Sequence, residues 1–375
     1  MGYVLVCAGE PSSDLHAAGV VAKLKEKRPD LRFIGVGGPA LQRLGFETLF
    51  SYAPITHTGL TEVVKHIPAA ICLLRNTLTL AKAFQPDVAL LVDSPDFNMR
   101  LLKKLNRAGI PVVYFIAPQV WAWRSQRVHA LKKYTKRLYV IFPFEVGYFK
   151  REGLDVQYVG HPFMQKIYNL LPNQKVYEQL GVEPDKPIVA LLPGSRYNEI
   201  KKLWPLFVHV WHVISKKHSN LTAVVPLAPG ITRDIIEGVF AIPKNVIVTN
   251  MASVDILSVA TIGLVSSGSA TLEAGLVGLP MVVAYKVSML TYLIAKSIVR
   301  IDHIGMVNLL SKERVVPEFV QNKATKENIA NALLRYLDDD GYLNSTRSRL
   351  FRLREVLGDS NAYKTLSGSL LKEFL

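Results

Sequence analysis

Short apolar runs rich in β-branched residues alternate along this chain with longer segments in which apolar residues recur every three or four positions. The short runs end at Gly, Pro or Asp, as strands of a buried parallel sheet do, and the longer segments have the period of helices. The predicted strands are YVLVCAG, RFIGVGG, VALLVDS, VVYFIAP, RLYVIFP and VQYVGHP in the first half, and IVALLPG, TAVVPLA, NVIVTN, IGLVSSG and PMVVAYK in the second. We therefore predict an α/β fold of two Rossmann-like domains, each built on a parallel sheet.

The boundary between the domains is predicted within VGHPFMQK, because its His-Pro pair ends a strand and the NLLPNQKV that follows resembles a linker. The domains are then residues 1–162 and 163–345, a division that suits a length of 375 residues. Residues 346–375 have helix-forming sequence to the end. We expect this segment to return to the first domain or to reach a partner chain.

Basic residues outnumber acidic residues by 45 to 30, which gives a formal net charge of +15. The segment from Phe97 to Phe144 holds ten basic residues and no acid. Such a charge predicts an anionic partner, which is a phosphorylated substrate, an anionic membrane surface or nucleic acid. A solvated surface without a partner is the alternative.

Cysteine content and hydropathy indicate the cellular compartment of the protein. Cys7 and Cys72 are the two cysteines, without a CxxC motif or a Cys/His cluster, so neither a disulfide framework nor a zinc site is predicted. The N-terminus runs straight into a strand without the features of a signal peptide. No uninterrupted apolar run reaches the roughly 18 residues that span a bilayer. We expect a cytoplasmic protein that is soluble or peripheral to a membrane.

The carboxyl ends of parallel strands are where a site is expected. LVSSGSATLEAGLVGLP predicts a strand, a turn and a helix that begins near Ser269. Amide groups at the helix start, with the hydroxyls of Ser267, Ser269 and Thr271, form a candidate site for phosphate oxygens. Glu273 lies too far from Ser269 for a capping box and can accept hydrogen bonds from ribose hydroxyls. A plain cap at Ser269 and compensation of the helix dipole by Glu273 are the alternatives.

IVALLPGSRYNEI predicts the first strand of the second domain and the loop that follows it. Gly194 permits close approach of the backbone, and Arg196 offers several donors to the charge that develops on a departing diphosphate. A turn followed by a surface arginine is the alternative.

VALLVDSPDFNMRLL places Asp93 at the end of an apolar strand, with Asp96 and Asn98 just beyond. Asp93 can act as a general base on an acceptor hydroxyl. The alternative is that Asp93 or Asp96 caps a helix beginning near Phe97, and we expect at least one of them to cap.

CAGEPSSDLHAAG closes the first strand and opens a helix. Capping explains Ser12, Ser13 and Asp14, whereas Glu10 is left as a candidate site residue.

GVGGPA matches a dinucleotide fingerprint, but it follows the second strand, its helix is cut short by Gly45, and no acid lies about twenty residues on. We interpret it as a tight turn.

Two further segments are candidates for contacts with an acceptor or a lipid. Trp123 and Arg124, in APQVWAWR, combine aromatic and basic character, which suits a sugar or an acyl chain, or nucleic acid; a core tryptophan is the alternative. Residues 59–84 predict a helix with one apolar face, which packs on a core or lies on anionic lipid. Val63, Val64 and Ile67 lie on that face.

The chain resembles the lipid-A-disaccharide synthases over nearly its whole length. The matching motifs are AGEPSSD, VDSPDFN, APQVWAWR, FPFE, LLPGSR, SSGSATLE, PMVVAYK and NLL. The resemblance implies two facing Rossmann-like domains of the GT-B type. It also implies an inverting, metal-independent transfer without a cofactor, from UDP-2,3-diacylglucosamine to 2,3-diacylglucosamine 1-phosphate, giving UDP and a β-1,6-linked disaccharide. A peripheral place on the inner face of the bacterial inner membrane and a possible homodimer follow from the same likeness and the charge.

The resemblance also assigns roles to residues. It implies that Asp93 is the general base and that Arg196 meets the UDP diphosphate. The other candidate catalytic residues are Asp96 and Glu10. The other candidate donor-site residues are Gly194, Ser195, Ser267, Gly268, Ser269, Ala270, Thr271, Glu273 and Asn308. The candidate acceptor or lipid contacts are Ser12, Asn98, Trp123, Arg124, Val63, Val64 and Ile67.

Departures from the family pattern affect the expectations for the first loop and for Asn308. Pro11 and Ser13 replace an Ala and a Gly that are common in the first loop, and Val307 stands where a proline is frequent before Asn308.

A UDP-sugar 2-epimerase or another GT-B transferase is the alternative enzyme. A nucleic-acid-binding protein is a weaker alternative, because no helix-turn-helix, OB-fold or RNA-recognition signature is present.

Overall fold

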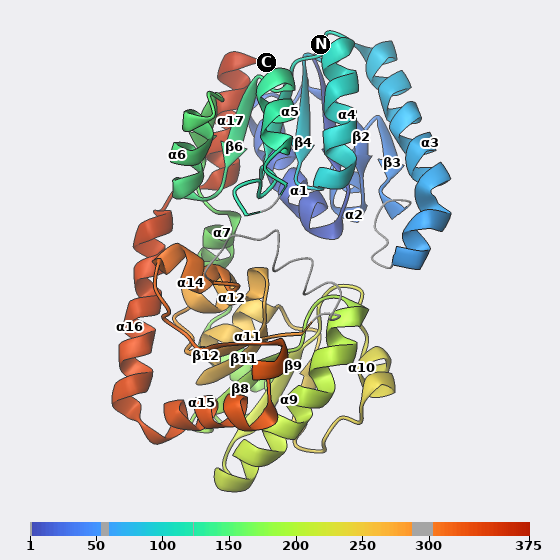
Figure 1. Ribbon diagram of the computed structural model, residues 1–375. Helices are drawn as coiled ribbons and strands as arrows, with labels where there is room; N and C mark the ends of the chain where they lie inside the picture. Colours follow the sequence, from blue (N-terminus) through green and yellow to red (C-terminus); the bar gives the residue numbers. More distant parts are fainter. Residues whose placement is uncertain (1, 54–59, 123, 287–302) are drawn as a thin grey trace. The chain divides into compact units, whose positions relative to one another are not determined.

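The structure is a computed structural model that describes residues 2–53, 60–122, 124–286 and 303–375, with backbone only at 48 and 60–66. The chain divides into two compact units (Figure 1). One comprises Met1–Pro162 and Asp359–Leu375, and the other comprises Phe163–Gly358. The segment predicted as residues 346–375 is thus divided at Gly358.

The first unit is built on a seven-stranded sheet whose described pairings are all parallel. Its strand order is β3-β2-β1-β4-β5-β6-β7. The strands are β1 (Tyr3–Ala8), β2 (Arg32–Gly37), β3 (Thr48–Ser51), β4 (Val88–Val92), β5 (Val112–Phe115), β6 (Arg137–Val140) and β7 (Val156–Tyr158). The helices are α1 (Pro11–Lys27), α2 (Pro39–Gln42), α3 (Leu60–Phe84), α4 (Pro95–Arg107), α5 (Arg127–Tyr134), α6 (Pro143–Arg151) and α17 (Ala362–Glu373).

The second unit is built on a six-stranded parallel sheet in the order β10-β9-β8-β11-β12-β13. Its strands are β8 (Ile188–Leu192), β9 (Thr222–Pro226), β10 (Val246–Thr249), β11 (Ile262–Ser266), β12 (Met281–Tyr285) and β13 (Glu318–Val320). Its helices are α8 (Asn173–Leu180), α9 (Tyr197–Lys217), α10 (Arg233–Val239), α11 (Ser253–Val259), α12 (Ser269–Leu276), α14 (Met306–Ser311), α15 (Lys326–Asp338) and α16 (Asp340–Leu357), with a 3-10 turn at Gln321–Lys323. Helix α7 (Pro162–Tyr168) begins at the boundary between the units.

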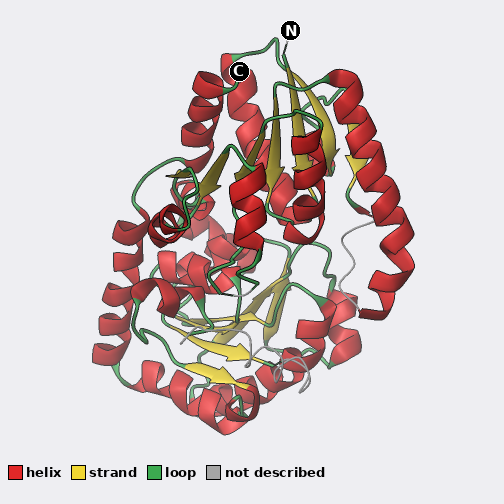
Figure 2. Ribbon diagram, turned by 45° about the horizontal axis from the view of Figure 1, so that its top comes forward, coloured by secondary structure: helices red, strands yellow, loops and turns green. Residues whose placement is uncertain are grey.

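Burial explains why the central strands read as continuous apolar runs. Every residue of β4, β5, β8 and β11 is buried, as expected where helices cover both faces of a parallel sheet. Figure 2 shows strands inside and helices outside in each unit. In the second unit, Trp204 and Trp211 of α9 are fully buried in the core. Two parallel-sheet α/β domains were predicted, and the structure confirms them.

The last helix of the chain belongs to the first unit. Helix α17 packs against α1, and the Tyr363 hydroxyl lies 2.9 Å from His16 Nδ1. A Cβ at Gly19 would lie 2.6 Å from the Tyr363 ring, so the glycine permits this close packing. Helix α16, by contrast, packs on α12, α14 and α15 of the second unit.

Helix α3 changes its environment along its length. Leu73, Leu74 and Ala81 are buried in the core, whereas Ile67 and Ile71 are 42% and 43% exposed. By length and composition alone, Ile67–Phe84 would suffice to cross a membrane, and 22% of it is buried. Arg75 and Lys82 interrupt this segment, so it is not an uninterrupted apolar run. Helices of water-soluble proteins pass the same test.

Candidate functional site

The loops after β1 and β4 are joined by hydrogen bonds at the carboxyl edge of the first sheet. The Gly9 amide donates to Ser94 Oγ over 3.0 Å, and the hydroxyls of Ser94 and Ser13 lie 3.1 Å apart. All strands of the sheet run in one direction, so their carboxyl ends lie along one edge. The structure thus brings the loop of Glu10 next to the loop of Asp93.

The turn that carries Asp93 has an unusual backbone. Asp93 and Ser94 both have left-handed conformations, with φ of 46° and 47°, which costs roughly 1–3 kcal/mol for each residue that is not glycine. The Asp93 carbonyl accepts hydrogen bonds from Asn98 Nδ2 at 2.8 Å and from the Tyr114 hydroxyl at 2.6 Å. These buried donors hold the turn, and with it the half-buried Asp93, in a defined position.

The predicted caps of the next helix need correction. Helix α4 begins at Pro95, not near Phe97, and its N-cap residue is Ser94, which makes no side-chain cap hydrogen bond. The expectation that Asp93 or Asp96 caps this helix is therefore wrong. Asn98 was predicted as an acceptor contact, but its side chain is fully buried and its amide donates to the backbone of the Asp93 turn.

Asp96 is paired with two arginines. Its Oδ1 accepts from Arg124 Nη1 at 3.0 Å and from Arg127 Nη2 at 2.5 Å. Partial burial works to raise the pKa of Asp96, but the hydrogen bonds and charges of Arg127 and Arg124 outweigh it, so the pKa lies below its usual value. A carboxylate of lowered pKa is a poor proton acceptor. Of the two aspartates, Asp93 is the better candidate for the general base.

The first loop is ordered by Ser13. The Ser13 hydroxyl accepts from the Glu10 amide at 2.9 Å and donates to the Glu10 carbonyl at 2.8 Å. Glu10 is the N-cap residue of α1 and its side chain is half-buried, whereas Ser12 is exposed. Asp14 is buried and does not act as a local cap in the way predicted. Its carboxylate accepts from the amides of residues 38, 40 and 41.

Two of these amide donors, those of Gly38 and Ala40, belong to the GVGGPA segment. Amides at the start of such a loop are what a pyrophosphate would need in a dinucleotide site. Here the Asp14 carboxylate takes the Gly38 and Ala40 amides, each at 2.8 Å, and the helix that follows, α2, has four residues. The segment is thus the end of β2 and the start of α2, joined at Gly38, rather than a separate turn.

Glu145, in the FPFE motif, was not singled out by sequence reasoning. Its side chain is buried, with Oε1 accepting from Trp121 Nε1 and Oε2 from the Phe142 amide, each at 3.1 Å. Burial raises the pKa of Glu145 to about 7, although its hydrogen-bond donors work in the opposite direction. This carboxylate ties helix α6 to the loop that contains Arg124. Trp123 of the same loop lies outside the described residues.

In the second unit, helix α12 begins at Ser269 as predicted. Its N-cap residue is Gly268, whose φ of 152° suits glycine, and Gly268 and Ser269 are exposed. Thr271 is buried, donates to the Gly268 carbonyl at 2.8 Å and accepts from the Met306 amide at 3.2 Å. Ser267 donates to a backbone carbonyl at 3.2 Å. Ser269 is thus the exposed hydroxyl of the three predicted.

Glu273 lies in the second turn of α12 and is 6% exposed. Its Oε1 accepts from Lys166 Nζ at 2.5 Å, and its Oε2 accepts from Ser253 Oγ at 3.0 Å. The Lys166 ammonium also lies 4.7 Å from the centre of the Phe163 ring. Lys166 and Ser253 thus occupy both oxygens of this carboxylate, and the Lys166 side chain is half-exposed.

The LLPGSR loop presents an exposed arginine at the start of a long helix. Gly194 has φ of +131°, and a Cβ there would lie 2.6 Å from Glu199 Cβ. The Glu199 carboxylate accepts from the Ser195 amide at 3.0 Å. This contact shapes the loop, and sequence reasoning missed it. Arg196 is the exposed N-cap residue of α9.

Asn308, predicted near the nucleotide, is fully buried. Its Oδ1 accepts from the Val315 and Val316 amides, and its Nδ2 donates to the Val316 carbonyl and to Glu318 Oε1, all at 2.8 to 3.0 Å. Both lone pairs of Oδ1 and both N–H donors of Nδ2 are therefore used within the protein. We assign Asn308 to the folding of its loop.

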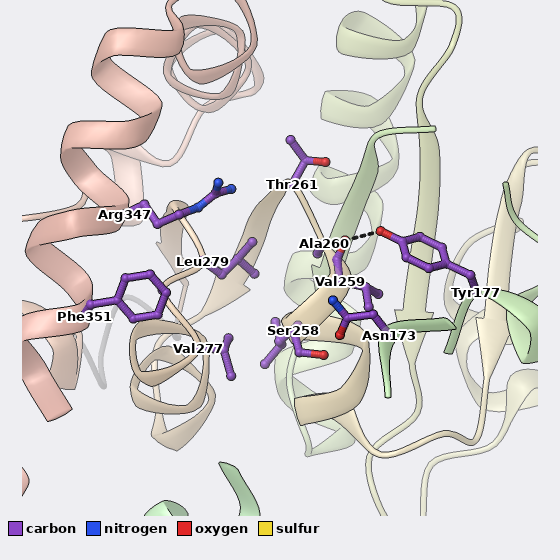
Figure 3. Close-up of a pocket in the computed structure, with 12 residues that line it drawn as sticks. Asn173, Tyr177, Ser258, Val259, Ala260, Thr261, Val277, Leu279, Arg347 and Phe351 are labelled. Carbon is purple, nitrogen blue, oxygen red and sulfur yellow. Dashed lines mark hydrogen bonds between the residues drawn. The ribbon is translucent and has the colours of Figure 1, made fainter. Parts of the chain in front are cut away.

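A pocket of about 340 Å³ lies elsewhere in the second unit (Figure 3). It is lined by the segments that precede β11 and β12 and by side chains of α8 and α16, including Tyr177, Arg347 and Phe351. Its place at the amino edge of the sheet separates it from the loops after β8 and β11. Over the described part of the chain, no group of three or more His, Cys, Asp or Glu side chains could hold a metal ion.

Comparison with known proteins gives a consistent result. The sequence model of a family described as lipid-A-disaccharide synthetase matches residues 4–368. The chain is 38% identical to the lipid-A-disaccharide synthase of Geobacter sulfurreducens over 98% of this chain and 96% of that protein. It is 38% identical to the lipid-A-disaccharide synthase of Myxococcus xanthus over 98% and 97% of the two chains.

Solved structures share the fold. The S. aureus MnaA–UDP co-structure superposes with a TM-score of 0.68 at 13% identity, covering 100% of this chain and 98% of that one. The Neisseria meningitidis UDP-GlcNAc 2-epimerase bound to UDP-GlcNAc gives a TM-score of 0.66 at 15% identity over 100% of both chains. A calicheamicin glycosyltransferase gives 0.59 at 15% identity over 99% of both. At these identities the likeness shows the fold alone, which is the predicted GT-B fold.

Proposed function

The chain belongs to the lipid-A-disaccharide synthase family, and from this premise we propose which of its residues bind the substrates and catalyse the transfer. The enzyme is a glycosyltransferase of lipid A disaccharide synthesis, with a nucleotide-sugar donor and a lipid-sugar acceptor. The epimerase alternative is not favoured, because the likeness to epimerases is confined to the fold.

The proposed reaction joins UDP-2,3-diacylglucosamine to 2,3-diacylglucosamine 1-phosphate. The 6-oxygen of the acceptor forms a bond to the anomeric carbon of the donor, on the face opposite UDP. The bond between that carbon and the diphosphate oxygen breaks, and UDP leaves with the electron pair. The proton of the 6-hydroxyl passes to a base. The product is a β-1,6-linked disaccharide 1-phosphate.

Asp93 is the proposed base. It ends the buried strand β4, and its turn is held by Asn98 and Tyr114 in a conformation that is costly for aspartate. Strained turns held in this way are common where a functional group must be placed accurately. Asp96 is engaged with two arginines and has a lowered pKa, which favours Asp93 for the proton. Glu10, in the neighbouring loop, is proposed to contact the acceptor.

Residues of the second unit are proposed to bind the departing UDP and to neutralise its negative charge. The exposed Arg196 guanidinium stands at the amino end of the 21-residue helix α9, next to the Gly194–Ser195 backbone. The exposed residues Gly268 and Ser269 open α12 at the end of β11, a strand paired with β8. Donors fixed where charge develops stabilise a transition state strongly. We propose that these groups, rather than a metal ion, neutralise the leaving diphosphate.

Glu273 is proposed to accept hydrogen bonds from the ribose hydroxyls after Lys166 has moved aside. Both carboxylate oxygens carry a donor in the unliganded protein, Lys166 on one and Ser253 on the other. Ribose hydroxyls would supply two donors in place of the ammonium. The Lys166 side chain is half-exposed, so its ammonium can be rehydrated when the ribose hydroxyls take its place at the buried carboxylate.

Attachment to an anionic membrane surface is proposed through the first turns of α3. Ile67 and Ile71 are exposed there, while Val63 and Val64 lie in the part of α3 whose side chains are not described. Apolar side chains with nearby basic residues suit the interface of an anionic leaflet. Such a place would give access to substrates that carry acyl chains.

The observation that carries the proposal is the family match over residues 4–368, which includes the Asp93 and Arg196 motifs. Incubation of the purified protein with both proposed substrates in detergent tests it. Mass spectrometry should detect the disaccharide 1-phosphate and an equal amount of UDP. Release of UDP without disaccharide, or a disaccharide without consumption of the phosphorylated acceptor, would contradict the proposed substrates.

A further inference from the structure

Two arginines of the first unit converge on one oxygen atom. Arg124 Nη1 lies 3.0 Å and Arg127 Nη2 lies 2.5 Å from Asp96 Oδ1. The three residues come from separate segments, namely the first turn of α4, the loop before α5 and the first position of α5. The guanidinium groups of Arg124 and Arg127 therefore point to one place at the carboxyl edge of the sheet, close to the Asp93 turn.

Fold stability does not account for this arrangement. The Asp96 side chain is 75% exposed, and ion pairs so exposed contribute about 0–1 kcal/mol. Arg124 has a left-handed backbone with φ of 51°, which costs roughly 1–3 kcal/mol for a residue other than glycine. The strain at Arg124 is at least as large as the gain from its ion pair. A backbone held in such a conformation is better explained by what its side chain must bind.

The segment that follows Asp96 is rich in basic residues. Two guanidinium groups face one carboxylate, and no acid occurs between Phe97 and Phe144. A phosphate monoester carries about −1.5 to −2 at neutral pH and presents three acceptor oxygens. Arginine binds such groups with paired, charge-assisted hydrogen bonds. A phosphate would thus match the two arginines better than a single carboxylate does.

We propose that Arg124 and Arg127 form the binding site for the 1-phosphate of the acceptor, and that Asp96 holds them in place until the acceptor binds. This inference rests on the proposed function and refines it. Asp93 and Asp96 lie three residues apart in the chain, so the arginines that bind Asp96 and the proposed base belong to the same edge of the sheet. A phosphate held at the arginines would place the sugar of the acceptor beside Asp93, the proposed base for its 6-hydroxyl.

The phosphate site would determine which acceptors react, because it would fix the position of the acceptor sugar. Holding one end of a substrate fixes the reacting hydroxyl against its base and removes the entropy of orienting it. An acceptor without the 1-phosphate would bind more weakly and in more than one orientation. Asp96 acts in this account as a counter-ion and not as a base.

The test compares two acceptors, 2,3-diacylglucosamine 1-phosphate and the same molecule without its phosphate, in identical detergent micelles. The measured quantity is the ratio of kcat/KM for the two acceptors. We expect the wild type to prefer the phosphorylated acceptor, and Arg127→Gln or Arg124→Gln to lower this preference by roughly 10- to 100-fold, the size expected for charge-assisted hydrogen bonds. Asp96→Asn should lower turnover far less than Asp93→Asn.

A matched control is available on the same helix. Arg107 is exposed in the last turn of α4, roughly 16 Å along the helix axis from Asp96. Arg107→Gln removes the same charge and should leave the preference unchanged. Arg127→Lys, which keeps the charge, should retain part of the preference. Thermal unfolding of each variant establishes that it is folded.

Several outcomes would overturn the inference. The preference could persist in both arginine variants, or it could fall equally in Arg107→Gln. Arg127→Gln could instead weaken binding to phosphatidylglycerol vesicles and slow both acceptors alike, which would make the arginines a lipid-headgroup site. A wild type that uses both acceptors equally contradicts this inference alone, whereas a wild type that forms no disaccharide contradicts the proposed function.

Discussion

The stability of the first unit should fall as the pH rises from about 4.5 to about 7, because of the carboxyl group of Glu145. This carboxyl is buried and its pKa is raised from 4.5 to about 7. The folded protein therefore binds the proton more tightly than the unfolded chain does. The stabilisation is fully present below the unfolded pKa and is lost as the pH passes through the folded one. A shift of this size corresponds to about 3 kcal/mol.

Glu145→Gln gives the matched comparison. The amide is neutral at every pH, but it can accept only one of the two hydrogen bonds that come from Trp121 and Phe142. The loss of one hydrogen bond costs about 1 kcal/mol. The variant should thus be less stable than the wild type by about 1 kcal/mol at pH 4.5 and more stable by about 2 kcal/mol at pH 8.

Native-state hydrogen exchange of peptides from β6 and α6 is the assay, because it reports on the first unit separately from the second. Glu152→Gln, which changes an exposed acid just after α6, should give a difference from the wild type that does not vary with pH. A difference between Glu145→Gln and the wild type that is equally constant from pH 4.5 to pH 8 would refute the reasoning.

Three further predictions follow from the second unit and α3. Arg196→Ala should lower turnover by roughly 100-fold or more and weaken UDP binding, as measured by calorimetric titration; unchanged affinity and rate would remove Arg196 from the site. Lys166→Met should tighten UDP binding, because it removes the ammonium that occupies Glu273 Oε1 in the unliganded protein, whereas 2′-deoxy-UDP should gain less; weaker UDP binding would show that Lys166 assists the nucleotide. Ile67→Ser with Ile71→Ser should reduce co-sedimentation with anionic vesicles without changing UDP affinity, and undiminished sedimentation would place membrane contact elsewhere.

The central strands could be predicted because burial on both faces leaves a continuous apolar run, which is visible in the sequence. The two strands that prediction missed, β3 and β13, lie at the sheet edges, each pairing with one neighbour. Thr48–Ser51 and Glu318–Val320 are short and, where their side chains are described, not fully buried. An edge strand needs no apolar run, so its sequence resembles that of a loop.

The proximity of the loops after β1 and β4 could also be predicted, because parallel strands bring their carboxyl ends to one edge. The exact partners of the candidate side chains could not. Asp14 binds amides 24 to 27 residues away, and Glu273 meets Lys166 over 107 residues. Asn308 was expected to contact the nucleotide, yet its side chain is buried and bound to the backbone that follows helix α14. Such contacts depend on how distant segments meet, which local patterns do not encode.

The central claim is that Asp93 removes the proton from the acceptor hydroxyl during glycosyl transfer. The direct test is the rate of disaccharide formation by Asp93→Asn, with UDP affinity measured on the same preparation. The account predicts a loss of turnover of roughly 10²-fold or more with UDP affinity unchanged. Turnover at the wild-type rate by the folded variant would contradict it.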